Sequence, residues 1–496
     1  MLHVRVWPGD GRVGARAERV RAPTMEPYNC AAGILARVVQ RRGSARNLCL
    51  DARVQQKRVV FKLVHETLRN LKAIDRALRD ADVHAQLGGG AAAAASGSAS
   101  APNAELARAA ARLFAYELLL GQGLHRRPGR SAPEVRSALA LVLKRRQQLK
   151  AAFAALGPAA RSRTPPPKLP RYVRVNTLKA TVEQVEAALA RVHPSVCRDP
   201  HVPALLRLPP GTDVHAHELV ASGRAILQDK ASCMPVLALR ARPGWRCVDA
   251  CAAPGNKTTQ LAAAVGARGR IVAFERDARR AELLSRRVGE AGAHAIVEVR
   301  HADFLSARPA DHRRVRALLV DPTCSGSGIV GRLGAPDEGE SADTNGGDAS
   351  APAERIAALA AMQQRVLCHA LSFPRATVVV YSTCSVHAAE NEGVVAAALG
   401  AVAPLGWRLG VALPAWPRRG LPNAGVELSD ELCARCVRCL PEDGCGGFFV
   451  ARFERPAALR AAFTTARRSR LALATRGPLR LQRVPARATA TTRWSA

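Results

Sequence analysis

Five short apolar runs in the second half of the chain place the strongest limit on its fold. They read RCVDA, RIVAFE, AIVEV, RALLVD and TVVVYS, and they lie between Arg246 and Ser382. Helical stretches such as NKTTQLAAAV and ARRAELLSRRV separate the first three runs. Short apolar strands that alternate with helices are typical of a parallel sheet covered on both faces. We therefore predict an α/β fold with a doubly wound, Rossmann-like sheet over residues 244–453.

The part of the chain before this sheet divides by composition. Apolar residues recur at helical spacing between residues 25 and 156, with basic residues between them, which predicts an all-helical N-terminal domain. A glycine- and alanine-rich segment, residues 88–104, interrupts this pattern and is interpreted as a flexible loop. A proline-rich linker at 157–170 leads to a small α/β subdomain at 171–243, which we expect to bind RNA.

Three further segments are predicted to lack regular structure. Residues 1–24 are arginine- and glycine-rich without periodicity, and we interpret them as a disordered arm or a start-site extension. Residues 332–354 are acidic, glycine-rich and poor in large apolar side chains, which predicts a disordered insertion in the sheet domain. Residues 454–496 carry ten arginines and one acidic residue, Glu454, and predict a basic disordered tail.

The net charge of the chain indicates a polyanionic partner. The sequence has 74 Lys and Arg against 40 Asp and Glu, a formal net charge of +34. An excess of this size favours nucleic acid as the partner, although arginine far outnumbers lysine, as a GC-rich coding sequence would also produce. Aromatic residues make up only 4% of the chain, which argues against a broad base-stacking platform.

Cysteine usage and hydropathy limit the compartment. The 13 cysteines are irregularly spaced and several lie inside apolar runs, which indicates a reducing compartment rather than a secreted disulfide scaffold. No apolar stretch reaches the length that spans a bilayer, and the N-terminus lacks the apolar core of a signal peptide. We therefore expect no membrane partner.

The first predicted strand leads into a loop suited to a nucleoside. The segment CVDACAAPGNKTTQLA turns at Pro254 and Gly255 and enters a helix. Small residues in the turn let a ligand approach the backbone, and the helix start offers free N–H donors. The second strand ends in Glu275, which can accept from both hydroxyls of a ribose, and Asp303 after the third strand could accept from an adenine amino group. Each residue alone is more often a turn or a helix cap, but the three in order at strand ends favour a binding site.

Two cysteines follow apolar runs in the same way. Cys324 lies in LLVDPTCSGSG and Cys384 lies in YSTCSVHAAENE. A lone cysteine beside apolar residues is usually buried filler, but two at neighbouring strand ends, each followed by serine, favour chemistry. A thiolate can add to carbon 6 of cytosine and make carbon 5 nucleophilic, which is covalent catalysis followed by general-base elimination. The two motifs alone do not tell which thiol attacks.

These segments together match a known family. DACAAPGNKT, DPTCSGSG, YSTCS, QDKAS and RVNTLK resemble the Sun-type (Fmu/Sun, RsmB-like) RNA cytosine-5 methyltransferases over about residues 170–453. The helical N-terminal domain and LPAWPRRGL near Trp416 are similar to the subgroup that methylates large-subunit (28S/25S) ribosomal RNA. The resemblance implies S-adenosyl-L-methionine as the cofactor. It also implies a class I S-adenosylmethionine-dependent methyltransferase fold with a seven-stranded mixed sheet, preceded by the all-helical domain.

The resemblance also implies roles for single residues. Cys384 is the nucleophile, Cys324 assists release of the product, and Asp321 hydrogen-bonds the ring nitrogen and the exocyclic amine of cytosine. The residues that it places at the cofactor are Cys251, Ala252, Ala253, Pro254, Gly255, Asn256, Lys257, Glu275, Arg280, Asp303 and Asp321.

Three polar residues before the sheet domain are predicted to contact RNA. They are Lys230, Arg174 and Asn176. A basic residue at Lys230 suits an RNA phosphate, although the same segment is also read as an ordinary helix entry capped by Asp229.

The segment CARCVRCLPEDGC raises the question of a metal. It places Cys433, Cys436, Cys439 and Cys445 in a short span, a spacing that could hold zinc or an iron–sulfur cluster. No histidine stands nearby, and we interpret the segment as a loop before the last strand. No metal site is therefore expected.

We predict an RNA (cytosine-5-)-methyltransferase that forms 5-methylcytosine in large-subunit ribosomal RNA through a covalent cysteine–cytosine adduct. Its expected setting is ribosome biogenesis in the nucleus and nucleolus, with ribosomal RNA and pre-ribosomal particles as partners and a monomeric state. Two alternatives stay open: a non-catalytic RNA-binding scaffold for ribosome assembly, and a transfer-RNA cytosine-5 methyltransferase. The intact set Cys384, Cys324 and Asp321 argues against the scaffold, and only resemblance of the flanking regions argues against the transfer-RNA enzyme.

Overall fold

The computed structural model describes residues 26–40, 42–43, 45–49, 51, 53–87, 101–124, 131–157, 167–329, 350–422 and 425–455. The described residues form two compact units, one before residue 166 and one from residue 166 onward, and each is described by itself. The arm predicted at residues 1–24 lies outside the described residues.

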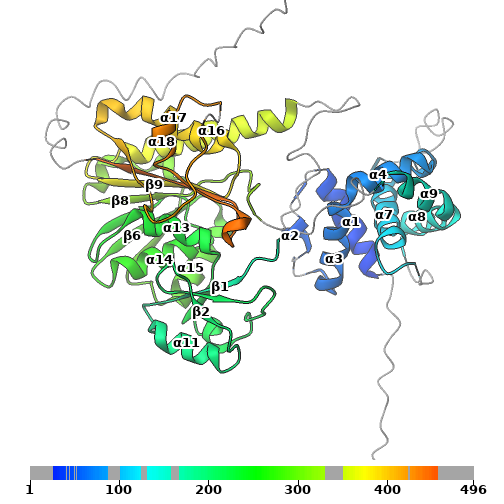
Figure 1. Ribbon diagram of the computed structural model, residues 1–496, viewed down its shortest axis with the longest axis horizontal. Coiled ribbons are helices and arrows are strands. Elements are labelled where there is room, and N and C mark those ends of the chain that lie inside the picture. The colour runs from blue at the N-terminus through cyan, green and yellow to red at the C-terminus, as the bar shows by residue number, and fades with distance from the viewer. Residues whose placement is uncertain are drawn as a thin grey trace, which may run out of the picture. The chain divides into compact units, whose positions relative to one another are not determined.

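The first unit is built from helices alone in its described residues (Figure 1). The helices are α1 (Glu26–Val39), α2 (Ala45–Cys49), α3 (Lys57–Arg69), α4 (Leu71–Asp80), α5 (Val83–Leu87), α7 (Ala101–Leu119), α8 (Pro133–Lys144) and α9 (Arg146–Ala155). Apolar side chains three and four residues apart share one helix face, and in α4 this spacing buries Ile74 and Leu78 completely. They join Leu35, Phe114 and Leu149 in one core.

One boundary of each of three segments predicted as irregular differs in the structure. The loop predicted at 88–104 ends earlier, because α7 begins at Ala101. The insertion predicted at 332–354 ends earlier, because α16 begins at Ser350. The tail predicted from residue 454 starts later, because Glu454 ends the last strand and Arg455 is buried. The remaining residues of these three segments lie outside the described part of the chain.

A small antiparallel sheet opens the second unit. Its strands are β1 (Arg171–Val175), β2 (Cys197–Arg198), β3 (Leu205–Leu208) and β4 (Ala225–Leu227), in the order β2-β3-β1-β4, with helices α11 (Val182–Ala190) and α12 (Glu218–Ala221). Thr181 and Gln184 form a capping box at the start of α11. Alternate side chains of β1 point to opposite faces, so Val173 packs toward α11 while Tyr172 packs toward the following domain.

The larger sheet follows in the same unit. Its strands are β5 (Arg246–Asp249), β6 (Arg270–Glu275), β7 (Val297–His301), β8 (Ala317–Val320), β9 (Val378–Thr383), β10 (Arg408–Gly410), β11 (Val437–Cys439) and β12 (Phe448–Glu454). Seven of them form a path in the order β10-β12-β9-β8-β5-β6-β7. Strands β5 to β9 are parallel, and β12 runs antiparallel between β9 and β10. The seven-stranded mixed sheet was predicted, but the short β11, which pairs with β12, was not.

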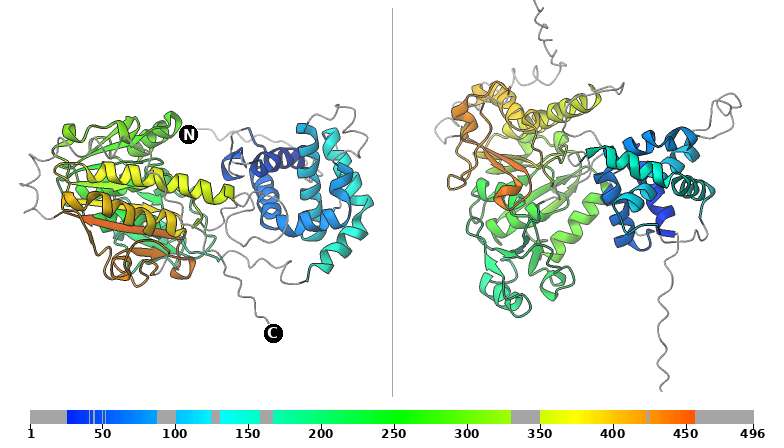
Figure 2. Two further views of the ribbon diagram at one scale, coloured as in Figure 1. Left: turned by 90° about the horizontal axis from the view of Figure 1, so that it is seen from above. Right: turned by 45° about the vertical axis from the view of Figure 1, so that its right-hand side comes forward.

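Helices cover both faces of the larger sheet. Helices α13 (Lys230–Leu239), α14 (Asn256–Val265) and α15 (Ala278–Glu290) contribute to one core, and α16 (Ser350–Leu371), α17 (Glu392–Val402) and α18 (Asp430–Cys433) contribute to the other. Neighbouring strand residues divide between the two cores, as Leu318 and Leu319 of β8 do. Figures 1 and 2 show α16 and α17, in yellow to gold, along the same face of the sheet. Among the described residues, no helix combines the length and apolarity that a membrane crossing needs.

Candidate active site

The two cysteines of the DPTC and YSTC segments meet at the carboxyl ends of two adjacent strands. Strands β8 and β9 are parallel neighbours with Val320 opposite Tyr381, so the segments that follow them leave the same edge of the sheet. The Sγ atoms of Cys324 and Cys384 lie 3.2 Å apart, and either thiol can donate to the other. Both side chains are half-buried. The sequence pattern placed these thiols at neighbouring strand ends, and the fold brings their sulfur atoms into contact.

Glycines let the loop that carries Cys324 lie against the neighbouring backbone. The N–H of Gly328 donates to the carbonyl of Cys384 at 2.9 Å, and the N–H of Gly447 donates to the carbonyl of Gly328 at 2.7 Å. A Cβ atom on Gly328 would stand 2.2 Å from the carbonyl oxygen of Gly447. The SGSG and CGG segments therefore consist of small residues because their two backbones are in direct contact. This contact fixes the position of the loop.

A buried network of hydrogen bonds also holds the loop that carries Cys324. Oε1 of Glu390 accepts from the N–H of Ser325 at 2.9 Å and from Nε2 of Gln363 at 2.9 Å, and Gln363 also donates to the carbonyl of Thr323 at 3.0 Å. The Tyr381 hydroxyl donates to Oε1 of Gln363 at 3.2 Å. Burial works to raise the pKa of Glu390, but its hydrogen bonds prevail and lower that pKa. Sequence reasoning missed Glu390 and Gln363, and the acidic residues just after YSTCS were the available signal.

An ion pair lies beside the thiols. Nζ of Lys257 is 2.8 Å from Oδ2 of Asp321, and the Ser382 hydroxyl donates to Oδ1 of Asp321 at 2.6 Å. Burial, the largest single influence, would lower the pKa of Lys257, but Asp321 together with Cys384 and Asp249 prevails and raises that pKa. Lys257 also interacts electrostatically with Cys384. The ion pair thus holds Lys257, which was predicted at the cofactor, near the carboxyl ends of β8 and β9, beside the thiols.

The cofactor loop after β5 is shaped by one glycine. Gly255 has φ +108°, and a Cβ atom there would lie 3.0 Å from a methyl group of Leu284, so other residues would be strained. The turn also contains a cis Ala253–Pro254 bond. Arg280 donates from Nη2 to the carbonyl of Ala253 at 2.8 Å. This hydrogen bond helps to fix the conformation of the loop just before α14. Cys251, Ala252 and Asn256 of the predicted set lie in the same loop and helix start.

Three carboxylates stand at or near the carboxyl ends of β5, β6 and β7. Glu275 is buried, accepts from the N–H of Asp277 at 3.0 Å and pairs with Arg280 at 3.2 Å. Asp303 is exposed and caps a 3-10 turn. Asp249 is buried and accepts from the Thr258 hydroxyl at 2.7 Å, while its Oδ1 has no hydrogen-bond partner among the described residues. Burial raises the pKa of Asp249 to about 6.

This donor and acceptor set fits S-adenosylmethionine. Glu275 and Asp303 offer acceptors for ribose hydroxyls and an amino group at adjacent strand ends. The unused oxygen of Asp249 faces a buried environment where an acceptor without a partner is costly. A cationic amino acid portion of a ligand would satisfy that acceptor.

The three residues predicted to contact RNA are buried and bonded within the protein. Arg174 donates to Oε1 of Gln228 at 2.7 Å and to the Thr259 hydroxyl at 2.9 Å. Asn176 donates to the carbonyls of Gly223 and Ala291 at 2.8 and 2.9 Å. Lys230 pairs with Asp199 at 2.9 Å. Their exposed fractions are 2%, 0% and 4%, in that order, so the packing favours a structural role. Contact with RNA stays a prediction for them.

The four clustered cysteines are buried on opposite sides of the sheet. Cys433 and Cys436 belong to the core under α16 and α17, whereas Cys439 and Cys445 belong to the core under α13 and α14. Cys439 and Cys445 interact with each other, but the two pairs lie in different cores, so the four thiols do not converge on one point. Among the described residues, no group of three or more His, Cys, Asp or Glu side chains is arranged to hold a metal ion.

Comparison with known proteins places this fold and site. Residues 236–454 match the family described as 16S rRNA methyltransferase RsmB/F. Residues 189–228 match the ferredoxin-like domain of NOL1/NOP2/Sun domain family member 5. The solved crystal structure of PH0851 covers 86% of this chain and 99% of its own at a TM-score of 0.58 and 20% identity, which shows a shared fold.

Curated relatives extend the match over most of the chain. The 25S rRNA (cytosine-C(5))-methyltransferase NSUN5 of Arabidopsis thaliana is 38% identical over 427 residues, which are 83% of this chain and 69% of the relative. The 28S rRNA (cytosine-C(5))-methyltransferase of Mus musculus is 36% identical over 86% of this chain and 90% of its own. The 25S enzyme rcm1 of Schizosaccharomyces pombe is 32% identical over 87% and 92%.

The fold and the site together define an S-adenosylmethionine-dependent methyltransferase. The chain belongs to the ribosomal RNA (cytosine-C(5))-methyltransferases of the Sun-domain, RsmB/F type. The predicted family, fold class, enzyme class and cofactor are thereby confirmed.

Proposed function

We propose that this protein methylates carbon 5 of a cytosine in large-subunit ribosomal RNA through a covalent adduct with Cys384. The observation that carries the proposal is the pair of thiols 3.2 Å apart, next to the Lys257–Asp321 ion pair. A cytosine C5 transfer needs one thiolate, a second group to assist release and an acid beside the ring. The relatives that match most of the chain are named as 25S and 28S rRNA enzymes, which supports the substrate class.

The electrostatics support different roles for the two thiols. The hydrogen bond to Cys384, together with burial, raises the pKa of Cys324 far above its ordinary value, so Cys324 stays a protonated thiol. Lys257 is charged and interacts with Cys384, and a nearby positive charge favours the thiolate. The charge at Lys257 supports Cys384 as the nucleophile, the role that the family resemblance implies.

The reaction then follows from the placement of these groups. The Cys384 thiolate adds to carbon 6 of cytosine while Asp321 orients the ring nitrogen and the exocyclic amine, which moves electron density to carbon 5. S-adenosylmethionine supplies the methyl group. The carbon-5 proton then leaves to a base, the electrons of the carbon 6–sulfur bond return to Cys384, and Cys324 assists this release from 3.2 Å.

The cofactor is held at the carboxyl ends of β5, β6 and β7. We assign its binding to Cys251, Ala252, Ala253, Pro254, Gly255, Asn256, Lys257, Glu275, Arg280, Asp303 and Asp321. The carboxylate acceptors of Glu275 and Asp303, at the ends of neighbouring strands, support this assignment.

The setting of the reaction follows from its substrate. We propose that the protein acts in the nucleus and nucleolus, on ribosomal RNA within pre-ribosomal particles, and as a monomer. The net charge of +34 supports a polyanionic partner.

A trapping experiment tests the function and both thiol roles. Cys324→Ala protein is incubated with large-subunit ribosomal RNA and S-adenosylmethionine and run on a denaturing gel. If Cys324 assists release, the variant accumulates a covalent RNA–protein adduct, which disappears when Cys384→Ala is added. Transfer RNA in place of ribosomal RNA is the substrate control. Absence of an adduct, together with absence of methyl transfer by the wild-type protein to any RNA, would favour the non-catalytic scaffold.

A further inference from the structure

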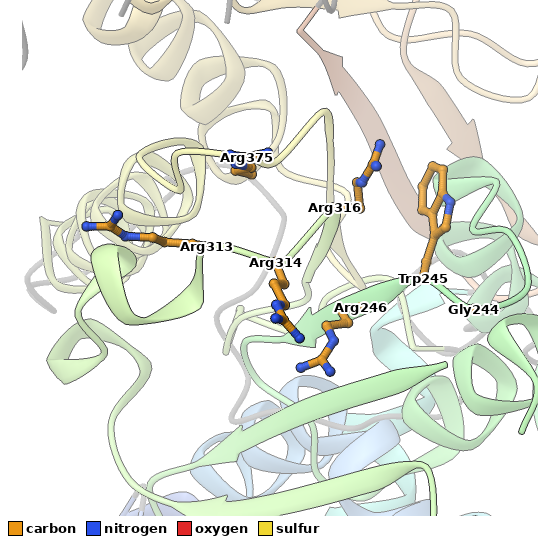
Figure 3. Close-up of a pocket in the computed structure, with 7 residues that line it drawn as sticks. All are labelled: Gly244, Trp245, Arg246, Arg313, Arg314, Arg316 and Arg375. Carbon is orange, nitrogen blue, oxygen red and sulfur yellow. The ribbon is translucent and has the colours of Figure 1, made fainter. Parts of the chain in front are cut away.

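A pocket lined by arginines lies at the amino edge of the larger sheet. Arg246, Arg313, Arg314, Arg316 and Arg375 line it, together with Gly244 and Trp245, around a cavity of about 560 Å³. Figure 3 shows these side chains around the pocket, carried by the start of β5 and by the segments that precede β8 and β9. Cys324 and Cys384 follow the carboxyl ends of β8 and β9. The pocket therefore lies at the opposite edge from the active site.

Strand register brings these separate arginines together. Strands β5, β8 and β9 are parallel neighbours, so their first residues share one edge. The N–H of Arg316 donates to the carbonyl of Arg246 at 2.8 Å, and the N–H of Thr377 donates to the carbonyl of Arg316 at 2.8 Å. Residues from three parts of the sequence thus form one cluster, and its backbone is held by the sheet.

The charges of this cluster lack a counter-ion in the described part of the chain. All five arginine side chains are exposed, and none of them forms an ion pair with a described carboxylate. Some exposed arginines elsewhere in the unit do form such pairs: Arg198 with Glu183 and Glu186, Arg300 with Glu298, and Arg308 with Asp311. Like charges gathered without acidic partners raise the local positive potential, and an anionic ligand relieves the repulsion.

The chemistry of the pocket fits a chain of phosphates. A guanidinium presents a planar fork of donors that binds phosphate oxygens, and five around one cavity exceed the need of a single phosphate. The half-buried ring of Trp245 offers a face on which a base or ribose can rest. We propose that this pocket binds the phosphodiester backbone of the RNA substrate, at a segment distinct from the one that carries the target cytosine. The identity of that RNA rests on the proposed function.

Binding and methylation with RNAs of two lengths test this proposal. The variant is Arg246→Gln/Arg314→Gln/Arg375→Gln, in the full chain. Removing three phosphate contacts should weaken binding to a long, structured large-subunit RNA by about tenfold or more at ~0.1 M salt, and should reduce the slope of log K against log salt by about 2. Methyl transfer to a short RNA that carries only the target segment should stay at the wild-type rate, because that RNA does not extend to the far edge.

The matched control removes the same number of charges elsewhere. Arg198→Gln/Arg300→Gln/Arg308→Gln deletes arginines that carboxylates already neutralise, and it should leave affinity and salt slope nearly unchanged. Equal losses in both triple variants, an unchanged salt slope in the pocket variant, or competition by polyglutamate as strong as that by RNA would overturn the proposal. RNA binding is measured without S-adenosylmethionine, so a protein that binds RNA through the pocket but transfers no methyl group would refute only the proposed function.

Discussion

The two edges of the larger sheet satisfy their polar groups in opposite ways. At the carboxyl edge, Lys257, Asp321 and Glu390 are bonded to groups of the protein. At the amino edge, the pocket arginines are exposed and have no carboxylate partner among the described residues. At the carboxyl edge, hydrogen bonds within the protein hold the side chains in one fixed geometry, as transition-state stabilisation requires. The amino edge leaves its donors for a ligand that brings its own charge, so substitutions there should affect binding and little else.

Loss of the nucleophile should have the largest effect at the carboxyl edge. Cys384→Ala removes the group that adds to carbon 6, and methyl transfer should fall by at least about 10³-fold. The thiol is half-buried, so the melting temperature and the affinity for RNA should change little. Radiolabelled methyl transfer to ribosomal RNA and thermal unfolding measure the two effects. A variant that keeps a tenth of the wild-type rate would exclude Cys384 as the nucleophile.

The network behind the active-site loop should come next in size. Glu390→Ala leaves the N–H of Ser325 without its acceptor and removes one of the two acceptors of Nε2 of Gln363, and each unsatisfied buried group costs about 1–3 kcal/mol. We expect a loss of unfolding free energy of about 3 kcal/mol and a fall in kcat of roughly 10²-fold, since the loop that carries Cys324 loses its support. Denaturant unfolding and steady-state kinetics measure these losses.

The conservative substitution Glu390→Gln tests whether Glu390 positions the active-site loop or only stabilises the fold. Glu390→Gln keeps an oxygen acceptor for Ser325 and should recover most of the rate. If Glu390→Gln and Glu390→Ala lose the same activity while stability differs, Glu390 does not act by placing the loop.

Local motifs predicted the carboxyl edge better than any other part of the molecule. Cys324 and Cys384 could be placed because parallel strands end at a common edge and each cysteine directly follows its strand. Glu390 was missed because its partner Ser325 is 65 residues away. The burial of Arg174 could not be predicted, because it depends on packing of the small subdomain against α14, which no local pattern encodes.

The cluster of arginines at the amino edge could not be predicted either, because its residues are also far apart in the sequence. Its arginines stand singly or in pairs in three separate segments, and only strand register gathers them. The short strand β11 also escaped prediction, because its apolar and cysteine residues are few and a loop before β12 explained them equally well.

A buried carboxylate at the carboxyl edge should make stability depend on pH. Burial raises the pKa of Asp249 from 3.8 to about 6. A raised folded-state pKa contributes stability below the unfolded pKa, and this stability is lost as pH rises through the folded pKa. Asp249→Asn removes this titration. Between pH 4 and pH 8 the unfolding free energy should therefore shift by about 2–3 kcal/mol in favour of the variant over the wild type.

Denaturant unfolding at several pH values measures this shift without S-adenosylmethionine. Because the comparison uses the change with pH, a constant loss from the new amide cancels. An equal pH dependence in the two proteins would show that Asp249 titrates at its ordinary pKa in the fold.

The smallest effect on stability should come from a substitution at the amino edge. This substitution tests whether the two edges of the larger sheet differ in the way described above. Arg375→Gln removes an exposed charge without a carboxylate partner among the described residues, so the unfolding free energy should change by less than ~0.5 kcal/mol, while affinity for long RNA falls about two- to threefold. Arg174→Gln is the matched change at a buried arginine with several acceptors, and it should lower the unfolding free energy by about 2 kcal/mol or more. If Arg375→Gln instead destabilises the protein as much as Arg174→Gln, the pocket arginines serve the fold, and the two edges do not differ in kind.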